Sequence, residues 1–243
     1  MRLSVIIPCY NEEKRIEESV DKIIKYIKSE KLDAELIFVN DGSTDNTQQI
    51  LNKLNIKLTE KQRIRNCIIS IENNTGKGYA LRKGIRKAKG DIILLCDADL
   101  STPITELGKL MGYINNYDLV VGSRKNNDSK IMKPQSFLRT FLGKTYSFMS
   151  RIILNVPLND FTCGFKLIKN NVAKKIVKKM SINRWAYDSE LLKIAEIHNF
   201  KLKEVGIIWQ NDPGTKVKLS TDIIASLRDL IKIRMYSFFK KYD

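Results

Sequence analysis

Short apolar runs alternate with longer amphipathic segments through the first half of the chain. The apolar runs lie at residues 3–7, 35–40, 67–71, 91–96 and 119–122. Runs of this length without polar alternation are typical of strands buried on both faces of a parallel sheet. The segments between them predict helices at about 12–31, 44–54 and 78–88. Strands that alternate with helices predict βαβ units, so we expect an α/β fold with a mainly parallel central sheet.

Two helices in the second half of the chain carry an apolar face bordered by basic residues. In the first, at about 134–156, the apolar side contains Phe137, Phe141, Phe148 and Ile152, with Leu138, Leu142, Met149 and Ile153 beside them. The other side of this helix contains Arg139, Lys144, Ser147 and Arg151. The second helix presents Ile224, Leu227, Ile231, Met235 and Phe238. We therefore divide the chain into a main domain at 1–218 and a basic amphipathic helix at 219–243.

Both amphipathic helices allow two interpretations. Basic helices that carry phenylalanine suit a membrane interface. Most apolar stripes, however, pack against the protein's own core, and for one helix alone we favour that interpretation. The presence of two such helices leaves membrane contact and core packing equally open.

The net charge of the chain limits the classes of partner that we expect it to bind. Lysine and arginine number 43 against 27 aspartate and glutamate residues, which gives a net charge of +16. A surface this positive favours phosphorylated ligands, anionic membranes or nucleic acid. A nucleic-acid-binding protein would explain the charge, but the chain lacks the interleaved aromatic and basic residues or the recognised module expected of one.

The cysteine and histidine content excludes several kinds of site. The cysteines, Cys9, Cys67, Cys96 and Cys163, show no CxxC spacing, which favours reduced thiols over disulfides or zinc ligands. His198 is the only histidine, so multi-histidine metal sites are excluded, and we interpret it as a surface turn residue without a chemical role. No apolar segment is long enough to span a bilayer, and the run at 3–8 is too short for a signal peptide. We expect a cytoplasmic protein, or one peripheral on the cytosolic face of a membrane.

The first candidate for chemistry is the segment DADLSTP at 97–103, which directly follows an apolar strand. In an extended segment residues i and i+2 point the same way, so Asp97 and Asp99 are expected to converge beyond the strand. Two hard oxygen ligands suit Mg²⁺ or Mn²⁺ held together with phosphates. The carboxyl end of a parallel sheet is also where such folds bind ligands. The alternative is a turn with two solvated aspartates.

Several motifs in order along the chain resemble one known family. They are SVIIPCYNEE (4–13), VNDGSTDNT (39–47), NTGKGYALRKG (74–84), DADLSTP (97–103), VGSR (121–124), DFTCGFKL (160–167) and RWAYDSELL (184–192). Together they resemble the family 2 glycosyltransferases of the GT-A fold, a Rossmann-like three-layer α/β fold. Within that family they look most like the polyprenyl-phosphate (dolichyl-phosphate) sugar synthases.

The resemblance implies a nucleotide-sugar site over the first strands. It assigns Pro8, Tyr10, Asn11, Glu12, Asp41, Lys77, Asp97 and Ala98 to the nucleotide sugar, and Asp97 and Asp99 to the metal. Asp41 would accept a hydrogen bond from the base; its alternative is a loop residue that bonds its own backbone. Some mannose-transferring relatives carry a glutamine where this chain has Ser101, which leaves a third metal contact open and weakens a mannose assignment.

The acceptor side implied by the resemblance is basic. Arg124, Arg139 and Lys216 match positions that hold phosphates, although ordinary surface charge would also explain them. Asp160 is the candidate that orients or deprotonates the acceptor, with Asp99 as its catalytic partner on the donor side. A salt bridge from Asp160 to Arg184 or another arginine is the rival explanation. Supporting positions are assigned to Arg184, Trp185, Asp188 and Glu190.

The activity implied by the resemblance is the transfer of a hexose, with inversion, from a nucleotide sugar to a polyprenyl or dolichyl phosphate at an anionic membrane surface. UDP-glucose is the favoured donor because the motifs at 160–167 and 184–192 look most like those of glucose synthases. GDP-mannose is the second choice. Transfer to a sugar hydroxyl is the third, and it would need a firmer general base.

Overall fold

The computed structural model of the protein describes residues 1–62, 64–212, 214 and 219–243. A seven-stranded sheet lies at its centre in the order β3-β2-β1-β4-β7-β5-β8. The strands are β1 (Leu3–Cys9), β2 (Ala34–Asp41), β3 (Arg65–Ile71), β4 (Ile92–Leu95), β5 (Leu119–Ser123), β7 (Lys166–Lys169) and β8 (Leu202–Gly206). Within this sheet β7 runs antiparallel to its neighbours β4 and β5, and the other pairs are parallel. The mainly parallel sheet is confirmed.

The five strands predicted from apolar runs are all present, with ends that differ by at most two residues. The sequence pattern missed β7 and β8, and also β6 (Lys130–Lys133) and β9 (Ile208–Gln210), which form a separate two-stranded sheet. In β7 only two apolar residues stand between Lys166 and Lys169, so the apolar run is too short to predict a strand. The first helix begins at Ile16 rather than near Glu12, because the chain first forms a turn after β1.

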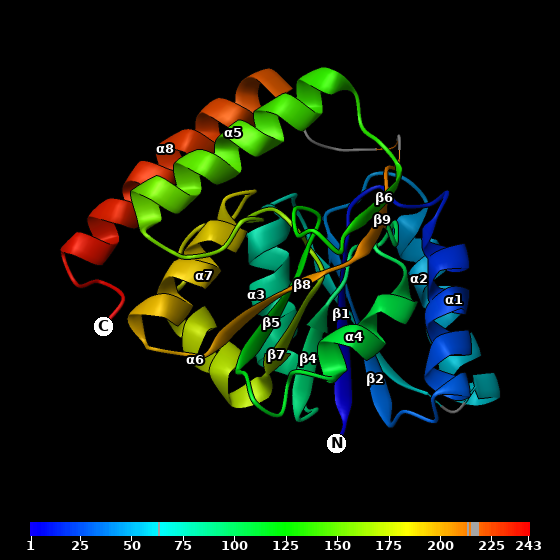
Figure 1. Ribbon diagram of the computed structural model, residues 1–243. Coiled ribbons are helices and arrows are strands. Elements are labelled where there is room, and N and C mark those ends of the chain that lie inside the picture. The colour runs from blue at the N-terminus through cyan, green and yellow to red at the C-terminus, as the bar shows by residue number, and fades with distance from the viewer. Residues whose placement is uncertain (63, 213, 215–218) are drawn as a thin grey trace.

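Helices cover both faces of the sheet. They are α1 (Ile16–Ser29), α2 (Thr47–Ile56), α3 (Lys77–Lys87), α4 (Leu107–Met111), α5 (Phe137–Leu154), α6 (Asn170–Lys179), α7 (Tyr187–Ile197) and α8 (Leu219–Phe238). A π-helical turn at Lys57–Gln62 follows α2, and a 3-10 turn at Ile104–Glu106 precedes α4. One core packs α1, α2 and α4 against the sheet, and a second core packs α3, α6 and α7 against its other face (Figure 1). The three-layer α/β fold is therefore confirmed.

The helices α5 and α8 lie side by side across one end of the molecule (Figure 1), and both contact α7. Their buried sides contain Tyr146, Leu154, Leu230 and Ile233. Their exposed sides contain Phe137, Leu138, Phe141, Phe148 and Ile152 on α5 and Ile224, Ile231 and Met235 on α8, with Phe238 and Phe239 at its end. Core packing is therefore the wrong interpretation for most of both predicted apolar faces. Ser147, expected on the outer side of α5, is instead buried.

The C-terminal helix α8 adjoins the core of the main domain. Because α8 packs on α5 and α7, it adjoins the same core as the main domain, and the division into 1–218 and 219–243 stays a prediction. In the part of the chain that the structure describes, no helix has both the length and the apolar character needed to cross a bilayer.

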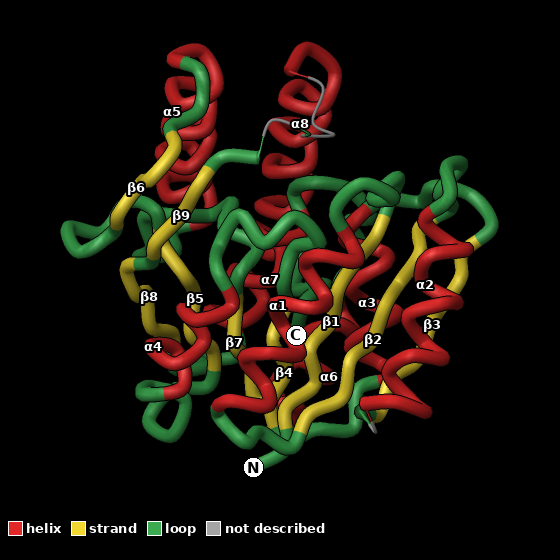
Figure 2. Tube along the Cα trace, turned by 90° about the vertical axis from the view of Figure 1, so that its right-hand side faces the viewer, coloured by secondary structure: helices red, strands yellow, loops and turns green. Residues whose placement is uncertain are grey.

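The sheet brings four loops to one edge. Since β1, β2, β4 and β5 are parallel, their carboxyl ends lie at the same edge, opposite the N-terminus (Figure 2). The segments that leave this edge begin at residues 10, 42, 96 and 124. They contain most of the motifs singled out from the sequence, which places the candidate site at the carboxyl edge, as expected for an open parallel sheet.

Candidate active site

The two aspartates after β4 lie in a turn, not in an extended segment. β4 ends at Leu95, the amide of Leu100 donates to the carbonyl of Asp97 at 3.2 Å, and Leu100 adopts a φ of 48°. The expectation that an extended backbone aligns Asp97 and Asp99 is therefore wrong. The backbone amide of Ser101 donates to Asp99 Oδ1 at 2.9 Å and so fixes the second carboxylate. The turn, rather than strand geometry, holds both acids at the edge.

The pKa values of Asp97 and Asp99 are shifted in opposite directions. Lys77, the first residue of α3, forms an ion pair with Asp97 at 2.5 Å. Burial alone would raise the pKa of Asp97, but the Lys77 ammonium outweighs it and lowers that pKa. For Asp99, burial and the neighbouring Asp97 charge both raise the pKa. The raised pKa of Asp99 beside Asp97 indicates that the surroundings do not fully balance the negative charge of these two carboxylates. Hard carboxylate oxygens in this state fit a divalent cation that would supply the missing positive charge.

Asp41 organises the loop that leads to Lys77. Its side chain is 2% exposed and accepts hydrogen bonds from the amides of Thr75 at 3.0 Å and Gly76 at 2.7 Å, and from the side chain of Asn74 at 3.1 Å. Gly76 has a φ of 117°, which disfavours a side chain at this position. Asp41 thus bonds a neighbouring loop rather than its own backbone. Its predicted contact with a base stays a prediction.

The turn after β1 is fixed by side chains from the loop after β2. Asn11 has a φ of 55° and accepts a hydrogen bond from the amide of Thr44 at 2.8 Å, so it links the turn after β1 to the loop after β2. Glu12 forms an ion pair at 2.6 Å with Arg15, which also pairs with Asp212. Of the other predicted positions, Pro8 and Tyr10 are half-buried and Ala98 is buried, close to the turn. Their contacts with a nucleotide sugar stay predictions.

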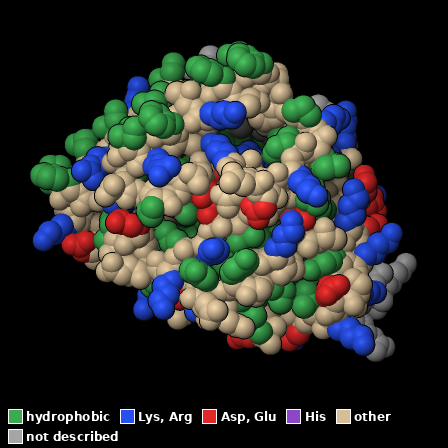
Figure 3. Space-filling view, in the orientation of Figure 1, with side chains coloured by type: hydrophobic (Ala, Val, Ile, Leu, Met, Phe, Trp, Pro, Cys, Tyr) green, Lys and Arg blue, Asp and Glu red, His purple; other side chains and the backbone are tan. Residues whose placement is uncertain are grey.

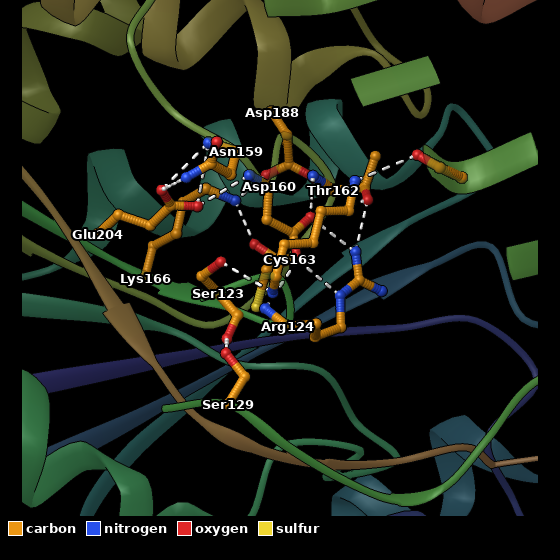
Figure 4. A network of polar contacts seen from close by, with 12 residues as sticks. Ser123, Arg124, Ser129, Asn159, Asp160, Thr162, Cys163, Lys166, Asp188 and Glu204 are labelled. Carbon is orange, nitrogen blue, oxygen red and sulfur yellow. Dashed lines mark hydrogen bonds and ion pairs between the residues drawn. The ribbon is translucent and has the colours of Figure 1, made fainter. Parts of the chain in front are cut away.

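Asp160 is held by Arg124 at the end of β5. Its carboxylate is fully buried and accepts from Arg124 three times: from Nε at 2.7 Å, from the terminal nitrogen Nη2 at 2.8 Å and from the backbone amide at 3.0 Å. Figure 4 shows the guanidinium facing this carboxylate, with Thr162 beside both. Burial would raise the pKa of Asp160, but Arg124 overrides it and holds that pKa well below its usual range. The rival explanation, an arginine salt bridge, is therefore confirmed with Arg124 as the arginine, and Asp160 is a weak base.

A second buried ion pair lies close enough to Asp97 to influence its pKa. Lys166 in β7 is fully buried and forms an ion pair with Asp188 in α7. The ring of Tyr187 lies between two ammonium groups, with its centroid 5.8 Å from Lys77 Nζ and 6.0 Å from Lys166 Nζ. Burial raises the pKa of Asp188, even against the opposing charge of Lys166. This pair joins β7 to α7, and the Lys166 charge also helps to lower the pKa of Asp97.

The remaining predicted positions divide into structural and untested ones. Glu190 is buried and accepts from Ser181, Ile182 and the hydroxyl of Tyr242, so it ties α7 to the preceding turn and to the C-terminus. Trp185 donates to Asp222 at 3.0 Å and so holds α8.

The basic positions assigned to phosphate are less fixed. Arg184 is exposed, and its Cγ lies against Gly76 rather than against Asp160. Arg139 is half-exposed near the start of α5. Lys216 lies outside the described residues, and its role, like that of Arg139, stays a prediction.

Sequence reasoning missed Arg15, Thr162, Lys166 and Asp212 as parts of the site. Arg15 had a weak signal, since it stands three residues after Glu12 and can pair with it along the turn. Lys166 and Thr162 lay inside a motif already identified, but a lysine in a strand gives no sign of burial. Asp212 pairs with a residue almost 200 positions away, and no local pattern predicts such a contact.

Gly164 gives the first testable prediction. A Cβ built there would lie 2.8 Å from the Asp97 Cγ and overlap its oxygens, so only glycine allows Asp97 its present place. We expect Gly164→Ala to displace Asp97 from Lys77 and to lower the sugar-transfer activity that the sequence resemblance implies by about tenfold or more, the scale seen when groups that orient a metal ligand are lost. Activity at saturating donor, with a thermal melt as the check on folding, measures this. Gly143→Ala is the matched control, because nothing lies within 4 Å of its added Cβ. Equal activities of the two variants would contradict the prediction.

Comparison with known proteins places this geometry in a family. Residues 4–177 match the family model described as Glycosyl transferase family 2. The chain is 32% identical to the dolichyl-phosphate beta-glucosyltransferase ALG5D of Trichomonas vaginalis, over 96% of this chain and 73% of that protein. It is also 32% identical to the human dolichyl-phosphate beta-glucosyltransferase, over 96% of this chain and 75% of that protein.

Solved structures show the same fold. Glucosyl-3-phosphoglycerate synthase from Mycobacterium tuberculosis, in complex with UDP, superposes with a TM-score of 0.69 at 19% identity and covers 96% of this chain and 80% of that one. The same enzyme with Mn²⁺, UDP and phosphoglyceric acid gives a TM-score of 0.68 at 18% identity, over 97% and 78% of the two chains. These neighbours confirm the predicted GT-A fold. With its family model matched over residues 4–177 and its relatives matched over 96% of its length, the chain belongs to glycosyl transferase family 2.

Proposed function

We propose that this glycosyltransferase moves glucose from UDP-glucose onto dolichyl phosphate, with inversion. The relatives at 32% identity carry the name dolichyl-phosphate beta-glucosyltransferase, which supports both the sugar and the acceptor. The observation that carries the proposal is the state of Asp160. Both of its oxygens are bound by Arg124 and its pKa is lowered, so it is poorly suited to take a proton from an attacking hydroxyl. An acceptor that needs no deprotonation fits such a site.

A phosphate monoester is such an acceptor. Its second pKa is near 6, so most of it is already dianionic at neutral pH. The tasks left to the protein are to position the acceptor oxygen in line with the donor and to control charge. Arg124, oriented by Asp160 and Thr162, and Arg139 on α5 are the groups we assign to the acceptor phosphate. Asp160 acts as a positioning residue in this scheme.

We assign donor binding to the residues at the ends of β1, β2 and β4. The turn at 10–12 and the loop that Asp41 holds would contact the nucleoside, and Lys77 would stay close to the diphosphate while paired with Asp97. Asp97 and Asp99 would hold a divalent cation, Mg²⁺ or Mn²⁺, which when bound neutralises the leaving nucleoside diphosphate. The complex of a fold neighbour with Mn²⁺ and UDP supports this assignment.

A direct assay tests the donor and the acceptor together. The protein is incubated with UDP-glucose or GDP-mannose and with dolichyl phosphate or dolichol, and the lipid product is weighed by mass spectrometry. We expect one hexose to be added to dolichyl phosphate from UDP-glucose only. Product from GDP-mannose alone would replace the donor assignment. Transfer to dolichol or to a sugar hydroxyl as readily as to the phosphate would overturn the acceptor assignment.

We also propose that the protein is peripheral on a membrane and binds it through α5 and α8. The exposed apolar residues of both helices lie on the same end of the molecule, where Figure 3 shows several groups of green side chains along the edge with tan surface between them. Monomeric soluble proteins rarely expose apolar patches this extensive without a partner. Basic side chains lie just below the patch, and each is worth about 1 kcal/mol near an anionic surface. An anionic leaflet fits this combination of surfaces.

The double variant Phe238→Ser/Phe239→Ser is predicted to bind anionic vesicles about tenfold more weakly. The two rings are 76% and 63% exposed, and transfer of half of their apolar area into lipid would contribute about 1.5 kcal/mol. Co-sedimentation with anionic liposomes at low salt measures the change. The control is Ile56→Ser/Tyr113→Ser, which removes exposed apolar area away from α5 and α8. An equal loss in both double variants, or no binding by the wild type, would show that the helices contact something other than a membrane.

A further inference from the structure

A lysine is fully buried in the central sheet, where charged side chains are rare. Lys166 is the first residue of β7, and the strand register places it beside Leu95 at the end of β4 and beside Val121 in β5. Leu95 stands two residues before Asp97, so Lys166 lies next to the start of the turn that holds the acids. Lysine is almost never fully buried unless it is paired.

The Lys166 ammonium holds two segments of the chain together. It forms an ion pair with Asp188 in the first turn of α7, and it donates to the carbonyl of Cys163. Figure 4 shows Lys166, Cys163 and Asp188 in one network of polar contacts. The lysine therefore fixes the peptide bond after Cys163 relative to the start of α7.

Stability alone does not explain this buried ion pair. Taking two charges out of water costs free energy that their attraction often fails to recover, and an apolar pair of similar size is frequently as stable or more stable. The neighbours of Lys166 in the sheet, Leu95 and Val121, belong to the apolar core, so a methionine in its place would extend that core. A methionine would not bond the Cys163 carbonyl. The reason for the lysine therefore lies in the groups that it places.

The segment that Lys166 fixes lies against Asp97. Gly164 follows Cys163, and a Cβ built on Gly164 would lie 2.8 Å from the Asp97 Cγ. The backbone at Gly164 is thus in close contact with this carboxylate, and a movement of residues 163–164 would change the space that the carboxylate occupies. Because Lys166 bonds the carbonyl of the peptide that joins Cys163 to Gly164, it sets the position of this contact.

The other half of the ion pair reaches Lys77. Asp188 follows Tyr187, whose buried ring has its centroid 5.8 Å from Lys77 Nζ and 6.0 Å from Lys166 Nζ. A Cβ built on Gly78 would lie 2.6 Å from the Tyr187 Cβ, so the start of α7 packs closely against the start of α3. The face of an aromatic ring attracts an ammonium group. An anchored Asp188 therefore keeps this ring next to Lys77.

We propose that Lys166 is a positioning residue for donor binding, with Asp188 as its counter-charge. Lys166 acts through Asp97, by way of the 163–164 peptide, and through Lys77, by way of the Tyr187 ring. The inference rests on the proposed function, in which Asp97 holds the cation and Lys77 lies close to the donor diphosphate.

A neutral replacement of the pair separates positioning from stability. Lys166→Met/Asp188→Asn removes both charges with side chains of nearly the same size, so the net charge is unchanged and no unpaired charge stays buried. We expect a melting temperature close to that of the wild type, but about tenfold weaker binding of UDP in the presence of Mn²⁺, the scale seen when groups that orient a metal ligand are lost. Calorimetric titration measures this affinity. In the transfer assay, the KM for the nucleotide sugar should rise more than that for the lipid phosphate.

The control makes the same two substitutions at the other end of β7. Lys169 forms an ion pair with Asp118 at 3.0 Å, and Lys169→Met/Asp118→Asn should bind UDP with Mn²⁺ as the wild type does. Wild-type affinity in Lys166→Met/Asp188→Asn would show that the buried pair is structural and would overturn the proposal. A wild type that binds no UDP with Mn²⁺ would instead reject the donor site itself, and this proposal with it.

Two substitutions of Tyr187 test the same arrangement without removing a charge. Tyr187→Phe keeps the ring beside Lys77, whereas Tyr187→Met fills the space with a flexible side chain that has no ring. We expect Tyr187→Phe to bind UDP with Mn²⁺ as the wild type does, and Tyr187→Met to bind several-fold more weakly. Equal affinities of these two variants would overturn the proposal even if Lys166→Met/Asp188→Asn does not fold. Thermal melts of all variants check folding.

Discussion

Replacing Asp99 by asparagine is expected to lower sugar transfer by about a hundredfold or more while the fold stays intact. A neutral amide is a poorer ligand than a carboxylate for a hard divalent cation. Asp99 is also the acid whose pKa is raised by burial and by Asp97, so removing its charge relieves repulsion in the apo protein. The variant should therefore be as stable as the wild type, or more stable. This combination separates a loss of chemistry from unfolding.

Three measurements check the Asp99 prediction. Chelation with EDTA should abolish transfer by the wild type, and Mg²⁺ or Mn²⁺ should restore it. Mn²⁺ together with UDP should raise the melting temperature of the wild type and not that of Asp99→Asn, since only the native site binds the pair. Asp33→Asn, which removes an exposed acid paired with Arg65, is the control and should behave as the wild type. Full activity of Asp99→Asn in the presence of chelator would end the metal assignment.

The parts of the fold that could be predicted are those encoded locally. Strands such as β1 and β4 are buried on both faces, so their apolar runs are unbroken and easy to identify. β7 is buried as well, yet it contains Lys166, whose charge is balanced by Asp188 22 positions later. That balance is a tertiary contact, and no periodicity in the sequence reveals it. The same reason explains why Arg124 could not be chosen as the partner of Asp160 from the sequence alone.

The sequence predicted which acids belong to the candidate site but not the backbone geometry that positions them. Asp97 and Asp99 lie at the expected edge, but a turn with Leu100 in a left-handed conformation places them there. The two amphipathic helices illustrate a different limit. Periodicity identified their apolar faces correctly, whereas exposure depends on which face the rest of the chain covers. The cores use Tyr146 and Leu230 and leave most of the phenylalanines outside.

Replacing Asp160 by asparagine is predicted to lower the free energy of unfolding by about 3–5 kcal/mol at neutral pH. The change leaves Arg124 partly buried without its counter-charge, and breaking one side of a buried ion pair typically costs this much. Thr162→Val is the graded control, because it removes one hydroxyl that accepts from Arg124 at 2.5 Å and should cost only about 1 kcal/mol. Urea denaturation at neutral pH measures both.

The same prediction has a pH dependence of fixed sign. The folded-state pKa of Asp160 is held below the unfolded value of about 3.9, so its stabilising contribution is present above that value. As the pH falls through and below 3.9, the contribution is lost. The difference in stability between the wild type and Asp160→Asn should thus be constant from about pH 7 to 5 and shrink in more acidic solution. A difference that grows on acidification would contradict the assignment of an ionised, paired Asp160.

Transfer activity should respond to Asp160→Asn in a different way. The native carboxylate is already ionised far below neutral pH, so it does not titrate in the working range. Loss of the carboxylate that orients Arg124 should therefore lower the rate by the same factor at every pH in this range. We expect the pH profiles of kcat/KM for the variant and the wild type to be parallel between about pH 6.5 and 8.5, with the variant lower and its KM for the lipid phosphate raised more than that for the nucleotide sugar. Asp160 would be a general base if the variant lost a limb of the wild-type profile in this range. That outcome would require the acceptor to be a hydroxyl group that must lose a proton, and it would overturn the phosphate acceptor.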